Sequence, residues 1–395
     1  MIDALRNDYI SEENTPYLFK LKNGLGTSKV VPIFGFEPDA SYMAGLYPDE
    51  SETGAQFYFN PYTSPFKSLK YIPDFLNKIP EIPDKILRKT FTYLLKRNSK
   101  SPVFTLPYIP FNVAHNFDFT FNYPVDSDLY LKDHETIFKL LKKNGKSYFI
   151  HTIPDYSVNS NMVLKRIKNN LTERVDFAFL MIGDLDLVGH QYGPSSDEIK
   201  KAIKKVDEVV SIVDEILSRR FGKIDFFIFG DHGMCEVDQL YNIELDIKST
   251  GLKQGKDYLY FIDSTMVRFW FFTSNAASII EEKLSGKEYG NILTSEEISF
   301  YHLNYIDNKI GELIFICNPG VLLFPNFYQK HKPVKGMHGY LPNVPEQQSC
   351  FFINSEKIES SYKNEKPVDM RRVFPTVLKL LELPIYNTFG IEPLV

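Results

Sequence analysis

Three short, glycine-flanked stretches of the chain combine carboxylate and imidazole side chains in a way that is typical of metal sites. Asp186 and His190 lie in IGDLDLVGHQYGP, Asp231 and His232 lie in FIFGDHGM, and His338 lies in KGMHGYLP. Each stretch follows, or lies near, a segment that predicts a β-strand. Oxygen and nitrogen ligands of this kind suit a borderline divalent cation, with zinc as the first expectation and manganese or iron as alternatives.

A further aspartate, Asp3, stands near the start of the chain, in MIDALRNDYI. It raises the set to three aspartates and three histidines, enough for two sites of three ligands that each keep an open position for substrate. We therefore predict a two-metal enzyme. A metal-binding aspartate of this kind normally ends a buried strand of several residues, but Asp3 lies only two residues after Met1. We expect either an unusually short strand or a sequence that lacks its true N-terminus, and we favour the second.

Two apolar segments, residues 174–183 and 223–230, lead into these metal-type residues. Their continuous rather than alternating apolar pattern predicts strands buried on both faces, as in a parallel sheet covered by helices. Ser195 or Ser196 can cap a helix between them. The apolar residues of that helix recur at helical spacing, namely Ile199, Ile203, Val206, Val210, Val213 and Ile216. Such a strand–helix–strand unit predicts an α/β fold with ligands at the carboxyl ends of the strands.

The composition narrows the class of protein. A length of 395 residues allows one large domain with a cap, or two modest domains. The net charge of -5 predicts no general attraction to a nucleic acid polymer. Three scattered cysteines, Cys235, Cys317 and Cys350, argue against a disulfide framework or a thiolate metal site. Without a secretory signal pattern or an apolar run long enough to span a bilayer, we expect a cytoplasmic protein, soluble or peripheral to a membrane.

Residues 55–150 differ in character from the rest, because they are rich in aromatic residues, prolines and turns. Within them, residues 66–100 hold nine Lys and Arg against three acidic residues, a net charge of +6 in an otherwise acidic chain. We interpret residues 55–150 as an inserted cap. The basic part is either a solvated helical face, the commoner meaning of a charge run, or a surface for an anionic lipid, a polyphosphate or a membrane interface.

The motifs together resemble the type I phosphodiesterase/nucleotide pyrophosphatase branch of the alkaline phosphatase superfamily. The resemblance covers most of the chain outside the cap and part of residues 240–330. It rests on MIDALRNDYI, AGLYPDE (44–50), DLVGHQYGP (186–194), GDHGM (230–234), GMHGY (336–340) and VFPTVLKLLELP (373–384). It implies one catalytic domain over residues 1–395, an α/β fold with a central, mostly parallel sheet flanked by helices and with the cap inserted. Pro375 marks a kink or a late start in the last of these helices.

The resemblance also implies a ligand set and a reaction. One ion would be held by Asp186, His190 and His338, and the other by Asp3, Asp231 and His232. The implied activity is metal-dependent hydrolysis or transfer of a phosphate ester, with a phosphodiester or pyrophosphate substrate first. Asp184, two residues before Asp186, is the residue most easily mistaken for a ligand, because its side chain could face the site or could hydrogen-bond to a ligand and orient it.

The position of the family's Thr or Ser nucleophile is occupied by Gly35, which has no side chain. Three explanations stay open. Glu37 or Asp39 could reach the metals, with Pro38 starting a helix behind them. A metal-bound water could attack directly. Hydrolysis could be lost and only binding kept. Glu37 is our first candidate for a functional residue, and a plain helix-capping carboxylate is the equally weighted alternative.

The family's phosphoryl-binding Asn also lacks a clear counterpart, and the nearest amides are Gln56 and Asn60. The main alternative to an enzyme is a metal-binding interaction protein that uses the basic cap as its surface. Another superfamily activity, such as a phosphomonoesterase, sulfatase or phosphomutase, ranks lower, because sulfatases and mutases need a Cys or Ser nucleophile that Gly35 does not supply.

Overall fold

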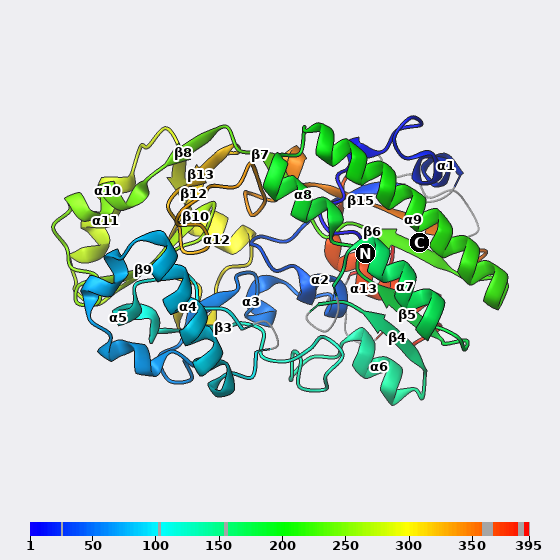
Figure 1. Ribbon diagram of the computed structural model, residues 1–395, viewed down its shortest axis with the longest axis horizontal. Coiled ribbons are helices and arrows are strands. Elements are labelled where there is room, and N and C mark those ends of the chain that lie inside the picture. Colours follow the sequence, from blue (N-terminus) through cyan, green and yellow to red (C-terminus); the bar gives the residue numbers. More distant parts are fainter. Residues whose placement is uncertain (25–26, 102–103, 154–156, 358–365, 386–390, 395) are drawn as a thin grey trace.

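The computed structural model describes residues 1–395 apart from residues 25–26, 102–103, 154–156, 358–365, 386–390 and 395. Figure 1 shows two lobes side by side. We call the lobe that contains the N-terminus the first lobe and the other the second lobe. The first lobe is built on the main sheet and its covering helices. The second lobe is built on a smaller antiparallel sheet and the helices around it.

The main sheet is mostly parallel, as predicted. Its strands are β16 (Val368–Asp369), β1 (Thr27–Val31), β15 (Ser349–Asn354) and β6 (Phe226–Phe229), in that order, with the pair β5 (Phe177–Leu180) and β4 (Tyr148–His151) beyond them. Ile2 links the two groups, because it forms parallel bridges to both Ile182 and Gly230. β15 runs antiparallel to its neighbours β1 and β6, while β4 runs parallel to β5 and β16 parallel to β1.

Helices cover both faces of this sheet, so its strands are buried on both sides. The covering helices are α1 (Pro16–Gly24), α7 (Ser160–Asn170), α8 (Asp184–Tyr192) and α9 (Asp197–Phe221) on one face, and α2 (Asp39–Ala44), α6 (Ile137–Lys143) and α13 (Val373–Leu380) on the other. On β6, Ile228 faces the first of these cores, and its neighbours Phe227 and Phe229 face the second. This alternation explains the continuous apolar pattern of the strand.

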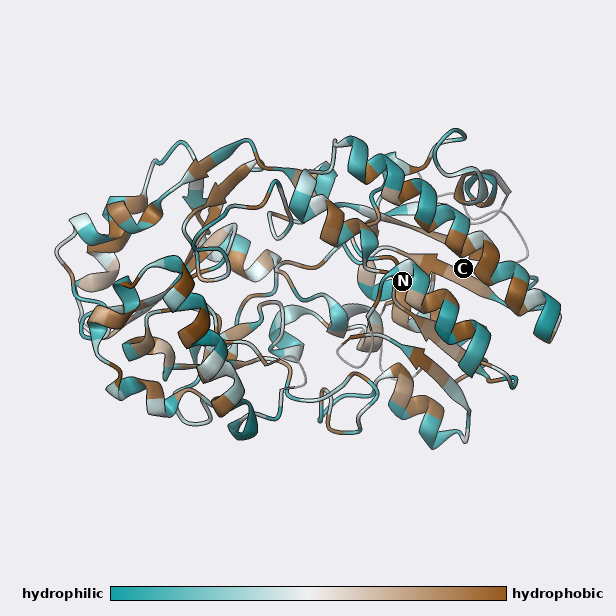
Figure 2. Cartoon of the chain, viewed as in Figure 1, coloured by the Kyte–Doolittle hydropathy of each residue, from teal (hydrophilic) through white to brown (hydrophobic). Residues whose placement is uncertain are grey.

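The predicted elements around the motifs are present. The two apolar segments form β5 and β6, and the helix between them is α9. Ser196 caps it, since its side chain accepts a hydrogen bond from the Ile199 N–H. α13 begins at Val373, so Pro375 lies in its first turn and marks a late start rather than a kink. Figure 2 shows hydrophobic residues concentrated in the main sheet and along part of α9.

The second lobe joins two distant parts of the chain. Its elements are α3 (Pro48–Ser51), β2 (Phe57–Phe59), α4 (Glu81–Leu95), α5 (Phe111–Ala114), β3 (Phe117–Phe119), β7 (Cys235–Glu236), β8 (Gln239–Tyr241), α10 (Ile243–Ser249), β9 (Tyr258–Ile262), β10 (Met266–Phe271), α11 (Ala276–Leu284), β11 (Gly290–Ile292), α12 (Ser295–Phe300), β12 (Leu313–Cys317), β13 (Val321–Leu323) and β14 (Gly336–Met337). One hydrophobic core contains residues from 57 to 119 and from 235 to 344.

The boundaries of the predicted cap therefore change. Of residues 55–150, those after about 120 belong to the first lobe, because α6 and β4 pack in its core. The remainder shares its core with the segment after β6, which lies outside the predicted cap. Arg268 on β10 joins the two parts, since its guanidinium donates to the Phe57 carbonyl oxygen at 2.9 Å and to Asp263 at 2.7 Å. No helix of the described part of the chain is both long enough and apolar enough to cross a membrane.

Candidate metal centre

The main sheet brings the candidate ligands together at the carboxyl ends of its parallel strands. Asp3 follows the Ile2 bridges, and Asp231 and His232 follow β6. Asp186 and His190 lie on α8, which begins shortly after β5, and are four residues apart and so share one face of the helix. His338 directly follows β14, which pairs with β7 next to the Asp231 loop.

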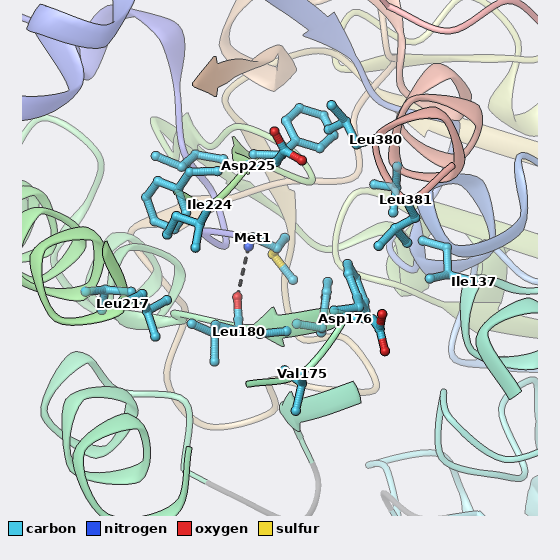
Figure 3. A pocket seen from close by; sticks show the side chains of 18 of the residues that line it. Met1, Ile137, Val175, Asp176, Leu180, Leu217, Ile224, Asp225, Leu380 and Leu381 are labelled. Atoms are coloured by element: carbon cyan, nitrogen blue, oxygen red, sulfur yellow. Dashed lines mark hydrogen bonds between the residues drawn. The ribbon is translucent and has the colours of Figure 1, made fainter. Parts of the chain in front are cut away.

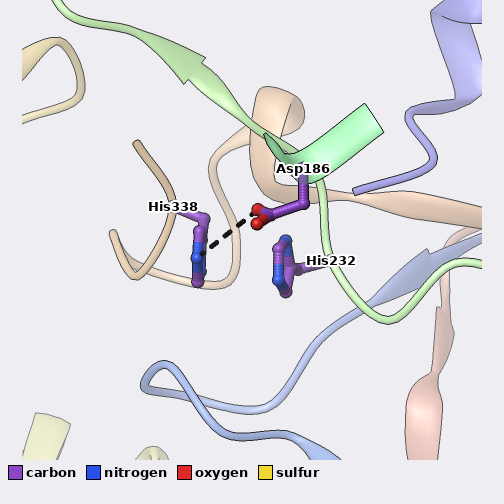
Figure 4. Close-up of side chains that lie close together, drawn as sticks. All are labelled: Asp186, His232 and His338. Atoms are coloured by element: carbon purple, nitrogen blue, oxygen red, sulfur yellow. Dashed lines mark ion pairs between the residues drawn. The ribbon is translucent and has the colours of Figure 1, made fainter. Parts of the chain in front are cut away.

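These side chains form one compact cluster. The Asp186 carboxylate oxygen Oδ1 lies 3.2 Å from His190 Nε2 and 3.9 Å from His338 Nε2. The Nε2 atom of His232 lies 3.5 Å from Asp3 Oδ1 and 3.7 Å from Asp231 Oδ2. Figure 4 shows the His232 and His338 rings beside the Asp186 carboxylate, and the two rings stack with their centroids 3.8 Å apart. All six predicted residues are therefore in one place.

Two groups of potential ligand atoms are closest to one another. One consists of Asp3, Asp231 and His232, the set that the family resemblance assigns to one ion. The other consists of Asp186, His338 and His232, so in this structure His232 takes the place expected of His190. His190 stays adjacent through its contact with Asp186. The division of the residues between two ions remains a prediction.

The donor set fits a divalent cation. His190 and His232 each place Nδ1 2.8 Å from a backbone carbonyl oxygen, which leaves Nε2 available to a metal. Two atoms of the cluster, Asp3 Oδ1 and His338 Nδ1, are buried polar atoms without a hydrogen-bond partner among the described residues, and Asp186 Oδ1 is buried with His190 Nε2 as its nearest partner at 3.2 Å. Because such atoms are costly to leave unpaired, a cation that satisfies the two carboxylate oxygens would stabilise the site.

Burial and crowding shift the pKa values of the cluster. Burial, together with the charges of Asp231 and Asp186, raises the pKa of Asp3 well above its ordinary value. Burial also raises the pKa of Asp231. Burial opposes ionisation of Asp186 too, but the hydrogen bond and charge of His190 lower its pKa. Burial and the neighbouring His232 hold the pKa of His338 well below its ordinary value, so its imidazole is neutral and able to bind a metal.

The position of the missing nucleophile has no room for a side chain. Gly35 adopts φ +109°, and a Cβ atom there would lie 2.0 Å from the carbonyl oxygen of Gly54. That oxygen accepts a hydrogen bond from the Phe36 N–H at 2.6 Å, so it is fixed in place. A hydroxyl-bearing residue at position 35 would require this backbone contact to break.

Glu37 and Asp39 lie near the cluster, since the charges of both raise the pKa of Asp3. Burial, followed by the charges of Asp39 and Asp231, raises the pKa of Glu37 to about 8. Burial raises the pKa of Asp39 to about 6, although a hydrogen bond from the Tyr42 hydroxyl opposes the shift. The N-cap of α2 is Pro38 and has no side-chain cap, so Glu37 does not serve as the helix-capping carboxylate.

Asn60, one of the two amide candidates, supports a turn. Its side-chain oxygen accepts hydrogen bonds from the backbone N–H groups of Tyr62 and Thr63, at 3.1 and 3.3 Å. Gln56 lies closer to the site along the chain, two residues after Gly54, whose carbonyl adjoins Gly35. A role in substrate binding remains a prediction for both.

Asp184 has a structural role. Its carboxylate accepts a hydrogen bond from the Ser160 N–H at 2.7 Å, at the start of α7, and lies 3.6 Å from the Lys205 ammonium. It therefore supports a helix start, and it belongs to neither group of potential ligands.

The structure adds residues that no sequence motif indicated. The Phe36 ring packs edge-on against His338, with centroids 5.7 Å apart. The Gln347 side-chain oxygen accepts from the Gly339 N–H at 2.8 Å and so fixes the loop that carries His338. Tyr130 is buried, its hydroxyl has no partner among the described residues, and the charges of Asp39 and Glu37 contribute to its raised pKa. Only the fold brings these residues to the site, and their spacing in the sequence carries no signal.

A buried cluster of carboxylates and imidazoles at the carboxyl ends of parallel strands is typical of the active sites of metal-dependent hydrolases. The sequence model of the type I phosphodiesterase / nucleotide pyrophosphatase family matches residues 1–341, and the chain belongs to this family. Human bis(5'-adenosyl)-triphosphatase ENPP4 is 22% identical over 409 residues, covering 98% of this chain and 79% of the relative. Venom phosphodiesterase 2 of Crotalus adamanteus is 33% identical over 268 residues, covering 65% of this chain and 31% of the relative.

Solved structures share the fold. Murine ectonucleotide pyrophosphatase / phosphodiesterase 5, as an inactive variant in complex with AMP, aligns with a TM-score of 0.69 and 14% identity, covering 98% of this chain and 94% of that chain. The human protein of the same name gives the same TM-score. The predicted α/β fold and the family resemblance are confirmed, and the chain is a phosphate-ester hydrolase by class.

Proposed function

We propose that the chain hydrolyses phosphodiesters or pyrophosphates with two divalent cations, zinc first and manganese or iron as alternatives. The observation that carries the proposal is the cluster of three aspartates and three histidines, in which the buried carboxylate oxygen Asp3 Oδ1 has no hydrogen-bond partner among the described residues. Asp3, Asp231 and His232 would hold one ion, and Asp186, His338 and His190 the other. When bound, such ions stabilise the charge that develops on the non-bridging oxygens of the phosphate.

Glu37 is the residue we propose for proton transfer. In the metal-free protein, burial raises the pKa of Glu37 to about 8, and we propose that this carboxyl group donates a hydrogen bond or a proton to a phosphate oxygen or leaving group. Asp39, two residues further along, accepts a hydrogen bond from the Tyr42 hydroxyl, and its charge adds to burial in raising the pKa of Glu37. Because the Gly35 position has no room for a side-chain nucleophile, a water molecule would attack the phosphorus, and Glu37 would protonate the oxygen of the leaving group.

The substrate class we propose is a nucleotide-like phosphate ester. Two comparisons support it: the name of the human relative specifies a bis(5'-adenosyl)-triphosphatase, and the murine structural neighbour was solved with AMP. The second lobe is rich in Phe and Tyr, and these rings would select the nucleoside or alcohol part of the substrate.

The test is a hydrolysis assay on bis-p-nitrophenyl phosphate, p-nitrophenyl phosphate and p-nitrophenyl sulfate, with zinc or manganese. We expect turnover of the diester, loss of it in Asp231→Ala, and a decrease in kcat of roughly 100-fold or more in Glu37→Gln. Glu173→Gln, a change at an exposed carboxylate, is the matched control and should keep full activity. If the protein binds no metal, the proposal is wrong.

Binding without turnover is the second candidate, and the closed Gly35 position favours it. Under this alternative, the protein would bind two equivalents of metal and retain AMP, yet would release no p-nitrophenol from any of the three substrates. Isothermal titration with zinc and then AMP, alongside the hydrolysis assay, separates the two functions.

For the partner surface, we propose a peripheral contact with anionic lipid through residues 66–100. The support is that large apolar side chains stand exposed among the lysines of this segment, including Tyr71, Phe75, Ile82, Ile86 and Tyr93. Flotation with phosphatidylserine vesicles should recover the protein at low salt, and phosphatidylcholine vesicles should not. The double variant Ile82→Ser/Ile86→Ser should lose binding, while Ile306→Ser, equally exposed but outside the segment, should keep it.

For the compartment, we propose the cytoplasm. The support is that Cys235, Cys317 and Cys350 are all buried free thiols, as a reducing environment favours. Fractionation of cells that express a C-terminally tagged chain tests this, and recovery only from the medium would contradict it.

A further inference from the structure

The three histidines of the metal cluster differ in how their rings are held. His190 places Nδ1 2.8 Å from the Gly336 carbonyl oxygen, and His232 places Nδ1 2.8 Å from the Gly233 carbonyl oxygen. A metal-binding histidine usually has such a partner, which fixes the orientation of its ring. The Nδ1 atom of His338, by contrast, is buried and has no hydrogen-bond partner among the described residues. The orientation of the His338 ring therefore depends on ring packing and on the backbone that carries it.

That backbone is held by one side chain, Gln347, which ends a short 3-10 helix (Pro345–Gln347) just ahead of β15. Its Oε1 accepts hydrogen bonds from the Gly339 N–H at 2.8 Å and from the Tyr340 N–H at 3.2 Å. Gln347 is only 2% exposed, so the loss of this acceptor would leave two buried N–H groups unpaired, which is costly. The two bonds fix the turn that directly follows His338.

The other parts of Gln347 contact the loop that carries His232. Because two N–H groups point at Oε1, the second polar atom of the amide is the donor Nε2, and it lies 3.2 Å from Cys235 Sγ. The Gln347 carbonyl oxygen accepts from the Gly233 N–H at 2.8 Å, directly after His232. Gln347 thus connects two metal-binding loops, and it holds the loop of His338 through its side chain alone.

The backbone around Asp3 is held by the main sheet and not by Gln347. The Asp3 N–H donates to the Ile182 carbonyl oxygen at 2.8 Å. Two residues earlier, the Met1 amino group donates to the Leu180 carbonyl oxygen at 2.9 Å, as Figure 3 shows. Both bonds go to the end of β5 and the residues just after it, so this strand positions Asp3.

Asp231 and His232 are also held by backbone groups. The Asp231 carboxylate oxygen Oδ1 accepts from the Ala4 N–H at 3.1 Å and from the His232 N–H at 2.9 Å. A substitution at Gln347 removes neither bond, and it keeps the backbone carbonyl oxygen to which the Gly233 N–H donates. The Gln347 side chain therefore acts on the ligands of only one of the two proposed ions.

We propose that Gln347 is the positioning residue of His338, and that its side-chain amide sets the affinity for the ion held by His338 and Asp186. The affinity for the ion held by Asp3 and Asp231 does not depend on this amide. The inference rests on the proposed two-metal centre. Gln347 acts through the backbone, because it holds the two N–H groups after the ligand rather than the imidazole ring.

Zinc titration by calorimetry, on protein first stripped of metal, compares the parent with three variants. Gln347→Met removes the accepting oxygen at nearly constant size, whereas Gln347→Glu keeps an accepting oxygen and, when protonated, a donor. Gln348→Met is the matched control: it makes the same change at the neighbouring half-buried residue, whose side chain makes no hydrogen bond in the described part of the chain.

We expect the parent to bind two equivalents of zinc. In Gln347→Met, one equivalent should keep the parental affinity, and the other should weaken by about 10- to 100-fold, as on loss of a group that orients a metal ligand. Gln347→Glu and Gln348→Met should both remain close to the parent.

The affected ion is identified by removing one ligand at a time. In an Asp231→Ala background, Gln347→Met should weaken the remaining ion by the same factor. In an Asp186→Ala background, Gln347→Met should leave the affinity for the remaining ion unchanged.

Amide exchange in the metal-free protein gives a readout without metal. In Gln347→Met, exchange over residues 337–341 should accelerate by at least about tenfold, because the Gly339 and Tyr340 N–H groups lose their acceptor. Exchange over residues 231–235 should stay unchanged. A merely structural role of Gln347 would instead accelerate exchange in both loops and weaken both ions.

Equal weakening of both ions in Gln347→Met would overturn the proposal, and so would an equal loss in Gln348→Met or in Gln347→Glu. A parent that binds two ions beside an unchanged Gln347→Met would overturn this inference alone. A parent that binds no zinc would overturn the proposed two-metal function as well.

Discussion

Gly35 is the residue at which this chain departs most clearly from its family, and the structure gives a backbone reason for keeping glycine there. Its positive φ and the close Gly54 carbonyl both exclude a side chain. Restoring the family's hydroxyl by a single substitution is therefore expected to fail for structural reasons before any question of chemistry arises.

Gly35→Ser should lower the free energy of unfolding by on the order of 3 kcal/mol without increasing hydrolysis, because it adds backbone strain and a clash. Gly145→Ser is the matched control: its φ is +63°, but nothing lies within 4 Å of the added Cβ. The control should cost about 1 kcal/mol. Urea unfolding measures both. If Gly35→Ser is as stable as the control, the close approach of Gly54 does not constrain this position.

Glu37 makes stability depend on pH in the metal-free protein. Its pKa rises from 4.5 to about 8, so between these values the folded state holds a proton that the unfolded state has released. Its contribution to stability is therefore present below about pH 4.5 and is lost as the pH rises through 8. Glu37→Gln removes this dependence.

The measurement is urea unfolding of the parent and of Glu37→Gln at pH 5 and pH 8, in the presence of a chelator. The variant should gain stability relative to the parent between the two pH values. The gain should be a few kcal/mol at most, since the half-buried carboxyl is partly screened by solvent (~1.4 kcal/mol per pKa unit). A difference that stays constant with pH would mean that the Glu37 carboxyl ionises normally.

At the scale of elements, α9 packs against α8, the helix that carries Asp186, and so helps to hold this ligand in position. Its start is defined by Ser196, whose side chain accepts from the Ile199 N–H and donates to the Gly193 carbonyl oxygen at 2.8 Å. The sequence allowed either Ser195 or Ser196 as the N-cap of α9, and in the structure the N-cap is Ser196.

Ser196→Ala should therefore cost about 1 kcal/mol of stability, as loss of an N-cap does. Ser195→Ala is the neighbouring control, because the exposed Ser195 side chain has no capping role, and its cost should be close to zero. Thermal unfolding of the two variants beside the parent decides the point. Equal losses would show that the cap is shared.

At the scale of the whole molecule, the second lobe depends on contacts between parts of the chain that are far apart in sequence. The fully buried Arg268 connects β10 to Asp263 and to the Phe57 carbonyl oxygen, and so connects the two halves of the lobe. Breaking such a pair leaves an uncompensated buried charge.

Asp263→Asn should destabilise the protein by about 3–5 kcal/mol and expose the second lobe to proteolysis first. Glu356→Gln, which breaks an exposed pair with Lys223, should change stability by about 0–1 kcal/mol. Urea unfolding followed by limited proteolysis and mass spectrometry gives both readouts. Equal protease sensitivity of the two lobes in Asp263→Asn would contradict the role given to Arg268.

The sequence by itself determined the local parts of this protein. Continuous apolar runs predicted β5 and β6, and helical spacing predicted α9. The glycine-flanked motifs supplied five of the six clustered side chains, and the opening segment supplied the sixth, Asp3. These features are encoded in neighbouring residues, through side-chain periodicity and capping chemistry, so they can be recognised without knowing the fold.

Only the tertiary structure determined the features that depend on contacts between segments far apart in the sequence. It placed Gly54 against Gly35, gave Asp184 a role at the start of α7, and built the second lobe from two separated parts of the chain. It also brought the Gln347 side chain to the turn that follows His338. The physical reason is that burial, steric exclusion and the pairing of backbone groups are properties of the packed chain, and no local pattern records which remote residue will supply the contact.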